Sequence, residues 1–226
     1  MEVCFVTKET LNGIWERDVK SVSNSNVVVF GFNGLGLVSY KKELSGETEY
    51  FQDLANFSKQ TASVVVSGAD TDNYGVFRQS VVIADKGKIL GVSDMLYTSV
   101  ESEYSPGGCF RVYETSAGKI GIIVGDDLFF TDSAKILSMC DADFIICIFK
   151  KIENSMPIIT VRSQAYCNGV PMAICSGEYA VICDAKGSVI LSGAGKVIKT
   201  KIKTGKEYFM VSSRKRGYYK NFNKTN

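Results

Sequence analysis

Short apolar runs recur along the whole chain, and polar or glycine-containing turns such as Asp85-Lys86-Gly87 separate them. The runs are rich in β-branched and aromatic residues, which favours β-strands over helices. Several are apolar throughout, as in Phe144-Ile145-Ile146-Cys147-Ile148-Phe149, and this is typical of strands that are covered on both faces. The predicted strands are the first residues, Met1–Val6, and then Val27–Phe30, Ser63–Ser67, Val76–Ala84, Phe110–Tyr113, Lys119–Val124, Asp143–Phe149, Val170–Cys175, Ala180–Cys183 and Ser188–Leu191.

Helical periodicity occurs in fewer segments. Glu47–Lys59 carries an apolar stripe at helical spacing, and Thr131–Met139 begins with Thr131 as a candidate N-cap. A short third helix is predicted over Thr160–Tyr166, after Pro157. Strands therefore outnumber helices, and helices interrupt them at intervals. This order indicates sheets sandwiched between helical layers in a single domain.

The composition, with 45% hydrophobic and 22% charged residues, is that of a soluble globular protein. No apolar run is long enough to cross a bilayer, and the start has an early acid instead of a basic leader, so we expect a cytoplasmic protein. The seven cysteines are an odd number and form no CxxC pair. We expect reduced thiols, several of them serving as small core side chains, and no disulfide framework or zinc site.

The chain of 226 residues has no histidine. This excludes Ser-His-Asp and Cys-His nucleophile pairs, His-ligated metals and the commonest general base. The net charge of +2 does not favour nucleic acid as a partner of the body of the protein. Residues 212–226 differ, because they form a basic, aromatic tail without an acid. We interpret the tail as a solvated or partner-packed terminus, with a weak nucleic-acid or anionic-surface contact as the alternative.

One segment carries a specific resemblance. Gly118 to Asp132, with the sequence GKIGIIVGDDLFFTD, resembles the nucleophile segment of the nitrilase (carbon–nitrogen hydrolase) superfamily, whose usual form is GKIGxxICYDxxFPE. Upstream, Ser105-Pro106-Gly107 and Val112-Tyr113-Glu114-Thr115 are similar to the PG and VFDT elements of that family. Downstream, the segment from Cys140 to Ile145 is similar to its GADLI strand.

Further segments extend the resemblance from Val27 to Leu191. Arg162 to Cys175 looks like the R-x-x-A-x-E-N-G-x-x-V passage, and Val27–Phe30 is similar to the strand that ends in FPE. Phe77 to Ile83, with the turn that follows, is similar to the YNxxxxIxxxG hairpin. The resemblance implies a four-layer α-β-β-α sandwich over residues 1–211, followed by the tail. It also implies a homodimer, because the family commonly pairs two sandwiches into eight layers.

In that family a cysteine thiolate attacks the substrate, a glutamate takes its proton and a lysine stabilises the developing charge. Here the cysteine position is Gly125, the glutamate position is Phe32, and the lysine position falls on Met95 or Asp94. All three roles are vacant, so the resemblance predicts a degenerate member. The residues expected to line the vestigial pocket are Phe32, Asp94, Met95, Gly125, Asp126 and Phe129.

Other residues offer fallback chemistry. Cys167 stands where the family usually has glutamate, but we interpret it as a buried packing residue because no histidine can activate it. Glu101 and Glu103 resemble the region of the family's supporting glutamate, with a solvated loop as the plainer interpretation. Asp126, Asp127 and Asp132 suggest oxygen ligands, yet a capping role near a helix start explains Asp127 and Asp132. We predict no metal and no cofactor.

The glycine-rich turn Gly31–Gly36 follows a strand but does not spell GxGxxG in register, and Ser45-Gly46 breaks any helix after it. We therefore interpret it as part of a remodelled pocket and not as a nucleotide site. The leading hypothesis is a non-catalytic protein that binds a small molecule, a protein partner or both. The alternative is a divergent amidohydrolase acting on a small amide or nitrile, with Cys167 or Cys109 as a relocated nucleophile. A third hypothesis is an interaction module that uses the tail.

Overall fold

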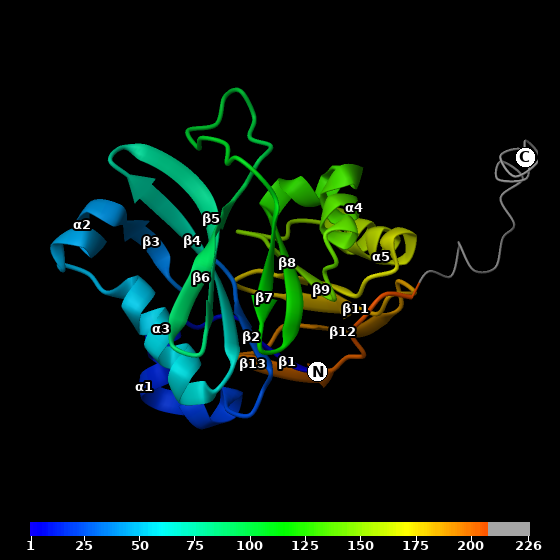
Figure 1. Cartoon of the computed structure of the whole chain (residues 1–226), viewed down its shortest axis with the longest axis horizontal. Coiled ribbons are helices and arrows are strands. Elements are labelled where there is room, and N and C mark those ends of the chain that lie inside the picture. Colours follow the sequence, from blue (N-terminus) through cyan, green and yellow to red (C-terminus); the bar gives the residue numbers. More distant parts are fainter. Residues whose placement is uncertain (208–226) are drawn as a thin grey trace, which may run out of the picture.

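The structure, a computed structural model, describes residues 1–207; the predicted boundary at 211 and the basic tail lie outside the described residues. Two sheets pack face to face, and helices cover the outer face of each (Figure 1). The layers follow the order α-β-β-α, as the resemblance implies. The described part of the chain contains no helix long and apolar enough to span a membrane.

The first sheet has the order β13-β1-β2-β4-β5-β6, with β3 also paired to β4. Its central strands β1, β2 and β4 run parallel, and β5, β6 and β13 are antiparallel to their neighbours. The strands are β1 (Glu2–Val6), β2 (Val27–Phe30), β3 (Gly36–Ser39), β4 (Val64–Asn73), β5 (Val76–Asp85), β6 (Lys88–Asp94) and β13 (Val197–Lys201).

The second sheet has the order β12-β11-β10-β9-β8-β7. Strands β8, β9 and β10 are parallel neighbours, so their carboxyl ends meet at one edge of the sheet. The strands are β7 (Arg111–Thr115), β8 (Gly118–Val124), β9 (Phe144–Ile148), β10 (Met172–Cys175), β11 (Ala180–Cys183) and β12 (Val189–Gly193).

Helices α1 (Leu11–Val22) and α3 (Tyr50–Thr61) cover the first sheet, and α4 (Thr131–Met139) and α5 (Met156–Asn168) cover the second (Figure 1). The short helix α2 (Tyr40–Ser45) precedes α3, and a single 3-10 turn, η1 (Gly125–Phe129), joins β8 to α4. Each helical layer buries apolar side chains against its sheet: Leu11, Ile14, Leu54 and Phe57 on one side, and Ala134, Leu137, Val161 and Ala165 on the other.

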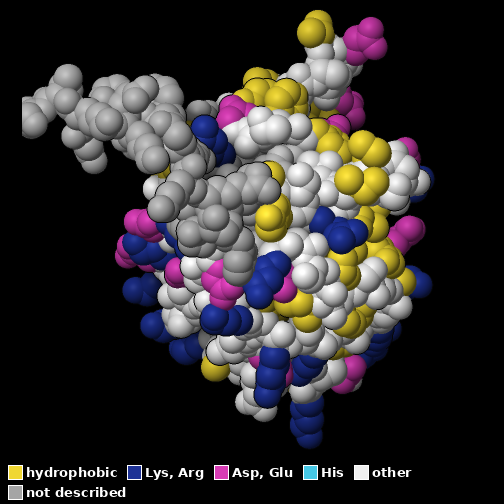
Figure 2. Space-filling model, turned by 90° about the vertical axis from the view of Figure 1, so that its right-hand side faces the viewer, with side chains coloured by type: hydrophobic (Ala, Val, Ile, Leu, Met, Phe, Trp, Pro, Cys, Tyr) yellow, Lys and Arg dark blue, Asp and Glu magenta, His cyan; other side chains and the backbone are white. Residues whose placement is uncertain are grey.

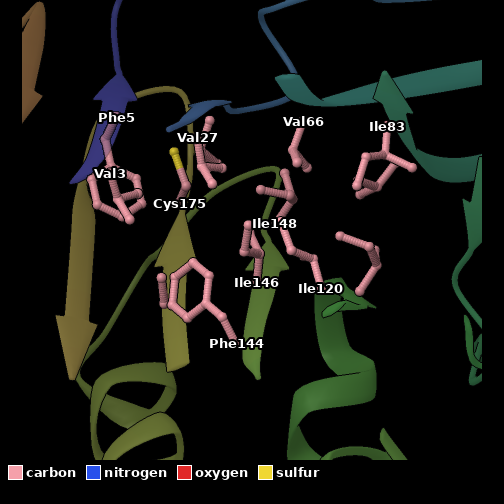
Figure 3. Packing of buried hydrophobic residues seen from close by; sticks show 14 of the residues in the cluster. Val3, Phe5, Val27, Val66, Ile83, Ile120, Phe144, Ile146, Ile148 and Cys175 are labelled. Atoms are coloured by element: carbon pink, nitrogen blue, oxygen red, sulfur yellow. The ribbon is translucent and has the colours of Figure 1, made fainter. Parts of the chain in front are cut away.

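The apolar runs are explained by the two-sided burial of the central strands. In β9, Phe144, Ile146 and Ile148 face the other sheet, whereas Ile145 and Cys147 face the helices. Side chains alternate between the two faces of a strand, so a strand in the middle of four layers needs apolar residues at every position. Figure 3 shows the side chains that meet between the sheets: Val3, Phe5, Val27, Val66 and Ile83 from one, and Ile120, Phe144, Ile146, Ile148 and Cys175 from the other.

The predicted helices differ from the observed ones mainly at their starts. Helix α4 has the predicted bounds, but its N-cap is Phe130 and no side chain caps it, so the prediction of Thr131 as the cap is wrong. Helix α5 begins before Pro157, which occupies the first turn. Proline is tolerated there because the first amides of a helix have no intrahelical acceptor.

Five helices and strands were not predicted from the pattern, namely α1, α2, β3, β6 and β13, and neither was the 3-10 turn η1. The break expected at Ser45-Gly46 ends α2, where Gly46 adopts φ +74°, but a six-residue helix precedes it. Four cysteines, Cys4, Cys147, Cys175 and Cys183, are buried as core side chains, as predicted for cysteines in apolar strands.

Candidate functional site

A sharp turn places Gly125 at the carboxyl end of β8, where the chain passes directly into η1. Gly125 adopts φ +52°, a left-handed conformation that glycine reaches without a Cβ penalty. A Cβ built at this position would lie 3.2 Å from Met95 Sδ and 3.4 Å from Gln79 Oε1. The two side chains that a residue at 125 would face therefore come from β5 and from the end of β6.

A cavity of about 380 Å³ lies over Gly125. Four of the six predicted pocket residues, Met95, Gly125, Asp126 and Phe129, line it. Phe32 and Asp94 do not line it. The lining residues are Gln79, Met95, Tyr97, Ser99, Ser102, Gly125, Asp126, Phe129, Phe149, Lys150, Lys151, Glu153, Asn154 and Pro157.

Phe32 lies in the core between the sheets with 7% of its surface exposed. Gly68 of β4 makes room for it, since a Cβ at Gly68 would lie 2.8 Å from Phe32 Cδ2. The ammonium of Lys150 is 6.0 Å from the ring centroid. Moving a phenyl ring out of water lowers the free energy of the folded protein, and this explains why the side chain packs in the core and does not line the cavity.

Asp94 and Met95 are adjacent, and their side chains take different directions. Asp94 accepts a hydrogen bond from Ser80 Oγ at 2.7 Å, directly across the β5–β6 ladder, and Arg78 Nε lies 3.8 Å from its other oxygen. Successive side chains of an extended segment point to opposite faces. Met95 is therefore the one of the two that faces Gly125.

Lys150 is a lining residue that sequence reasoning missed. Its Nζ lies 2.8 Å from Asp70 Oδ2 of β4 and donates to Tyr104 OH at 2.6 Å. Desolvation alone would lower the pKa of Lys150, but the bonds to Asp70 and Tyr104 outweigh it and raise the pKa, so the side chain stays cationic. The signal available in the sequence was its place directly after an apolar strand, at the carboxyl end where ligand sites collect.

Asp127 fixes one wall of the cavity. Its side chain is 1% exposed, and it accepts hydrogen bonds from Leu96 N at 2.9 Å and Tyr97 N at 2.8 Å. Burial is the main reason that the pKa of Asp127 rises to about 6, against the opposing effect of these two amides. The prediction that Asp127 caps a helix start is therefore wrong: its carboxylate binds the loop that follows β6.

The loop of residues 95–110 joins β6 to β7 at the top of Figure 1, and Tyr97, Ser99 and Ser102 of this loop line the cavity. Tyr97 stacks on Phe130 with ring centroids 3.7 Å apart, and its hydroxyl donates to Asp132 Oδ2 at 3.2 Å. Further along, Tyr104 accepts the bond from Lys150. The loop is thus tied to η1, to the start of α4 and to the end of β9.

The fallback residues lie outside the cavity lining. Cys167 is exposed, so the prediction that it packs in the core is wrong: Val161 and Ala165 form the buried face of α5, and Cys167 points away from it. Cys109 is also exposed. Glu101 and Glu103 are exposed in the loop, although their neighbour Ser102 lines the cavity.

Cys147 is the thiol that contacts the backbone of the turn at Gly125, between β8 and η1. Its Sγ lies 3.7 Å from the carbonyl oxygen of Gly125, on the side of β9 that faces the helices. Burial raises the pKa of this thiol well above its ordinary value, so it stays protonated and inert. Within residues 1–207, no group of three Asp, Glu or Cys side chains could hold a metal ion.

A four-layer α-β-β-α sandwich in which β8 turns into η1 at Gly125 defines the class of this protein as a nitrilase-like fold. A family model described as carbon-nitrogen hydrolase matches residues 15–208, and the chain belongs to this family. It is 27% identical over 128 residues to a nitrilase of Pyrococcus abyssi, covering 54% of this chain and 48% of that protein. A probable nitrilase of Schizosaccharomyces pombe is 23% identical over 139 residues, or 58% and 51% of the two chains. The matched region spans about half the length of these curated relatives.

Solved structures agree with the fold. Nit3 of Saccharomyces cerevisiae, a nitrilase-superfamily member, superimposes with a TM-score of 0.73 at 17% identity, covering 100% of this chain and 95% of that one. A mutant of the amidase from Nesterenkonia, in complex with butyramide, gives a TM-score of 0.73 at 12% identity, with 99% and 97% of the chains covered. At these identities the likeness concerns the fold alone.

Proposed function

We propose that this carbon-nitrogen hydrolase family member binds a small molecule in the cavity over Gly125 and does not hydrolyse it. The observation that carries the proposal is the lack of a reactive side chain at Gly125, where β8 turns into η1. The side-chain direction at Gly125 leads to Met95 and Gln79, and none of these three residues provides a thiolate, a general base or a cation. A cavity of about 380 Å³ is nevertheless kept, which suits a small ligand.

Release of ammonia from small amides, nitriles and carbamoyl compounds by the purified protein tests the proposal. We expect no release above the uncatalysed rate, because the covalent mechanism has no nucleophile at Gly125. Release that iodoacetamide abolishes would contradict the proposal and assign the reaction to a relocated cysteine.

The alternative, a divergent amidohydrolase, requires such a cysteine in contact with the substrate. None of the described residues that line the cavity is a cysteine, and Cys109 and Cys167 lie elsewhere on the surface. The thiol that contacts the backbone of Gly125, Cys147, is buried and protonated. These positions favour binding over catalysis.

We also propose that two copies pair through the α4–α5 layer. Several large apolar side chains of this layer are exposed: Ile136 at 40%, Met139 at 74%, Met156 at 53%, Ile159 at 54% and Tyr166 at 40%. Figure 2, which views the right-hand side of Figure 1, shows hydrophobic side chains gathered among polar ones on this part of the surface. Helices α1 and α3 on the opposite layer have no comparable exposed side chains among the described residues. Exposed apolar surface of this kind is typical of subunit contacts.

Replacing Ile159 with glutamate is expected to shift the protein from dimer to monomer, since it places a charge in the apolar contact. The control is Leu44→Glu, which introduces the same charge at a side chain that is 79% exposed on α2. Sedimentation velocity at micromolar concentration measures both. A monomeric wild-type protein, or equal behaviour of the two variants, would contradict pairing through α4–α5.

A further inference from the structure

The charged side chains that line the cavity are nearly all paired. Lys150 lies 2.8 Å from Asp70, and Lys151 lies 3.3 Å from Glu153. Each of these pairs is neutral, and Tyr104 takes another donor of Lys150. The two lysines therefore add little net positive charge to the cavity.

Asp126 is the exception. It lines the cavity next to Gly125, its side chain is exposed, and within residues 1–207 it has no ion pair. The negative charge of Asp126 repels that of the neighbouring Asp127 and contributes to the raised pKa of Asp127. The lining thus carries one uncompensated negative charge, next to Gly125.

Aromatic rings line the same cavity as this carboxylate. Tyr97, Phe129 and Phe149 all line the cavity, and Phe129 meets Phe149 edge-to-face with centroids 6.2 Å apart. Ring faces attract organic cations through their quadrupole, and an adjacent carboxylate adds a charge-assisted hydrogen bond. A carboxylate among aromatic rings is a combination that discriminates cations from neutral and anionic molecules of the same size.

We propose that the cavity takes a small organic cation, a primary ammonium or guanidinium compound, whose charged group pairs with Asp126 against these rings. This inference rests on the proposed function, because it assigns the ligand class of the same cavity. The ligand's other end extends toward Gln79, Ser99 and Asn154, which supply neutral polar contacts. The missing side chain at Gly125 leaves the floor open for the ligand.

The test uses three four-carbon probes that differ in charge: butylammonium, butyramide and butyrate. NMR titration of the full-length chain at low salt measures their affinities. We expect butylammonium to bind about tenfold more tightly than butyramide, and butyrate to bind least, as one charge-assisted hydrogen bond implies. Equal affinities, tighter binding of butyramide or butyrate, or no binding of butylammonium would overturn the inference.

Variants locate the effect. Asp126→Asn is expected to weaken butylammonium about tenfold and to leave butyramide within about twofold, and Asp126→Glu to restore most of the affinity. Glu101→Gln is the control, because it removes one negative charge from an exposed side chain outside the cavity lining. A loss as large for Glu101→Gln as for Asp126→Asn would overturn the assignment. Ammonia released from butyramide would refute the proposed function, whereas a lost preference for the cation would refute only the ligand class.

Discussion

Replacing Asp127 with alanine is expected to lower the free energy of unfolding by about 2–3 kcal/mol at neutral pH. The substitution leaves the amides of Leu96 and Tyr97 without the acceptor that both now share. Unpaired amides are costly when water does not replace the lost partner, and the wall formed by the loop of residues 95–110 depends on these two bonds. Asp127→Asn keeps one acceptor oxygen for these amides and removes the buried charge, so it should lower the free energy of unfolding less than Asp127→Ala does. Urea unfolding followed by circular dichroism measures both.

The pH dependence of stability gives a second readout for the same residue. The pKa of Asp127 is about 6 in the folded protein, whereas an unfolded aspartate has a pKa of about 3.9. Between these values the folded state holds the proton more tightly, so the stability from this group is complete below about pH 4 and is lost as pH rises through about 6. The loss is at most about 3 kcal/mol. Asp127→Asn should flatten this part of the profile, and an unchanged slope would contradict the buried carboxylate.

Replacing Gly31 with alanine is expected to destabilise the protein by more than about 3 kcal/mol or to prevent folding. A Cβ at Gly31 would lie 2.4 Å from Gly177 N and 2.4 Å from Ser176 C, and both are backbone atoms that no side-chain rotation can move aside. The contact joins the turn before Phe32 to the turn between β10 and β11. The end of β2 in the first sheet therefore lies directly against the end of β10 in the second sheet.

The control for this substitution is Gly108→Ala. A Cβ there would meet no heavy atom within 4 Å. The expected change is within about 1 kcal/mol, with a gain possible because alanine restricts the unfolded chain. Similar unfolding midpoints in urea for Gly31→Ala and Gly108→Ala would contradict the close approach of the two turns.

Much of the fold follows from the spacing of apolar residues. The apolar run Asp143–Phe149 gives strand β9, and the segment Gly118–Asp132 gives β8 together with the turn at Gly125. Helix α1 was missed because Gly13 weakens its helical pattern in the sequence. In the structure the helix is kinked at Asp18, and packing of its apolar residues against the first sheet stabilises it. Strand β13 was missed because it pairs with β1 from the far end of the chain.

The lining residues that the sequence predicted are Met95 and those of one continuous segment around Gly125. Gly125 and Asp126 follow directly from the strand-to-helix turn, but Gln79 reaches the cavity from β5 and Lys150 from the segment after β9, where it pairs with Asp70 of β4. Their meeting depends on strand register and on side-chain direction, which a single sequence does not specify. Phe32 was identified as the residue at the glutamate position, but its burial could not be predicted. The burial depends on Gly68, which has no side chain and so leaves room for the ring.

The most direct test of the central claim is ammonia release measured with butyramide, small nitriles and carbamoyl compounds, with the Nesterenkonia amidase as a positive control for the assay. Each substrate is tested at several protein concentrations, with and without prior treatment with iodoacetamide. We predict that release stays at the background of the protein-free reaction in every arm. Release that rises in proportion to protein concentration and disappears after alkylation would contradict the account, because it would require a working thiol, and none of the lining residues within 1–207 is a cysteine.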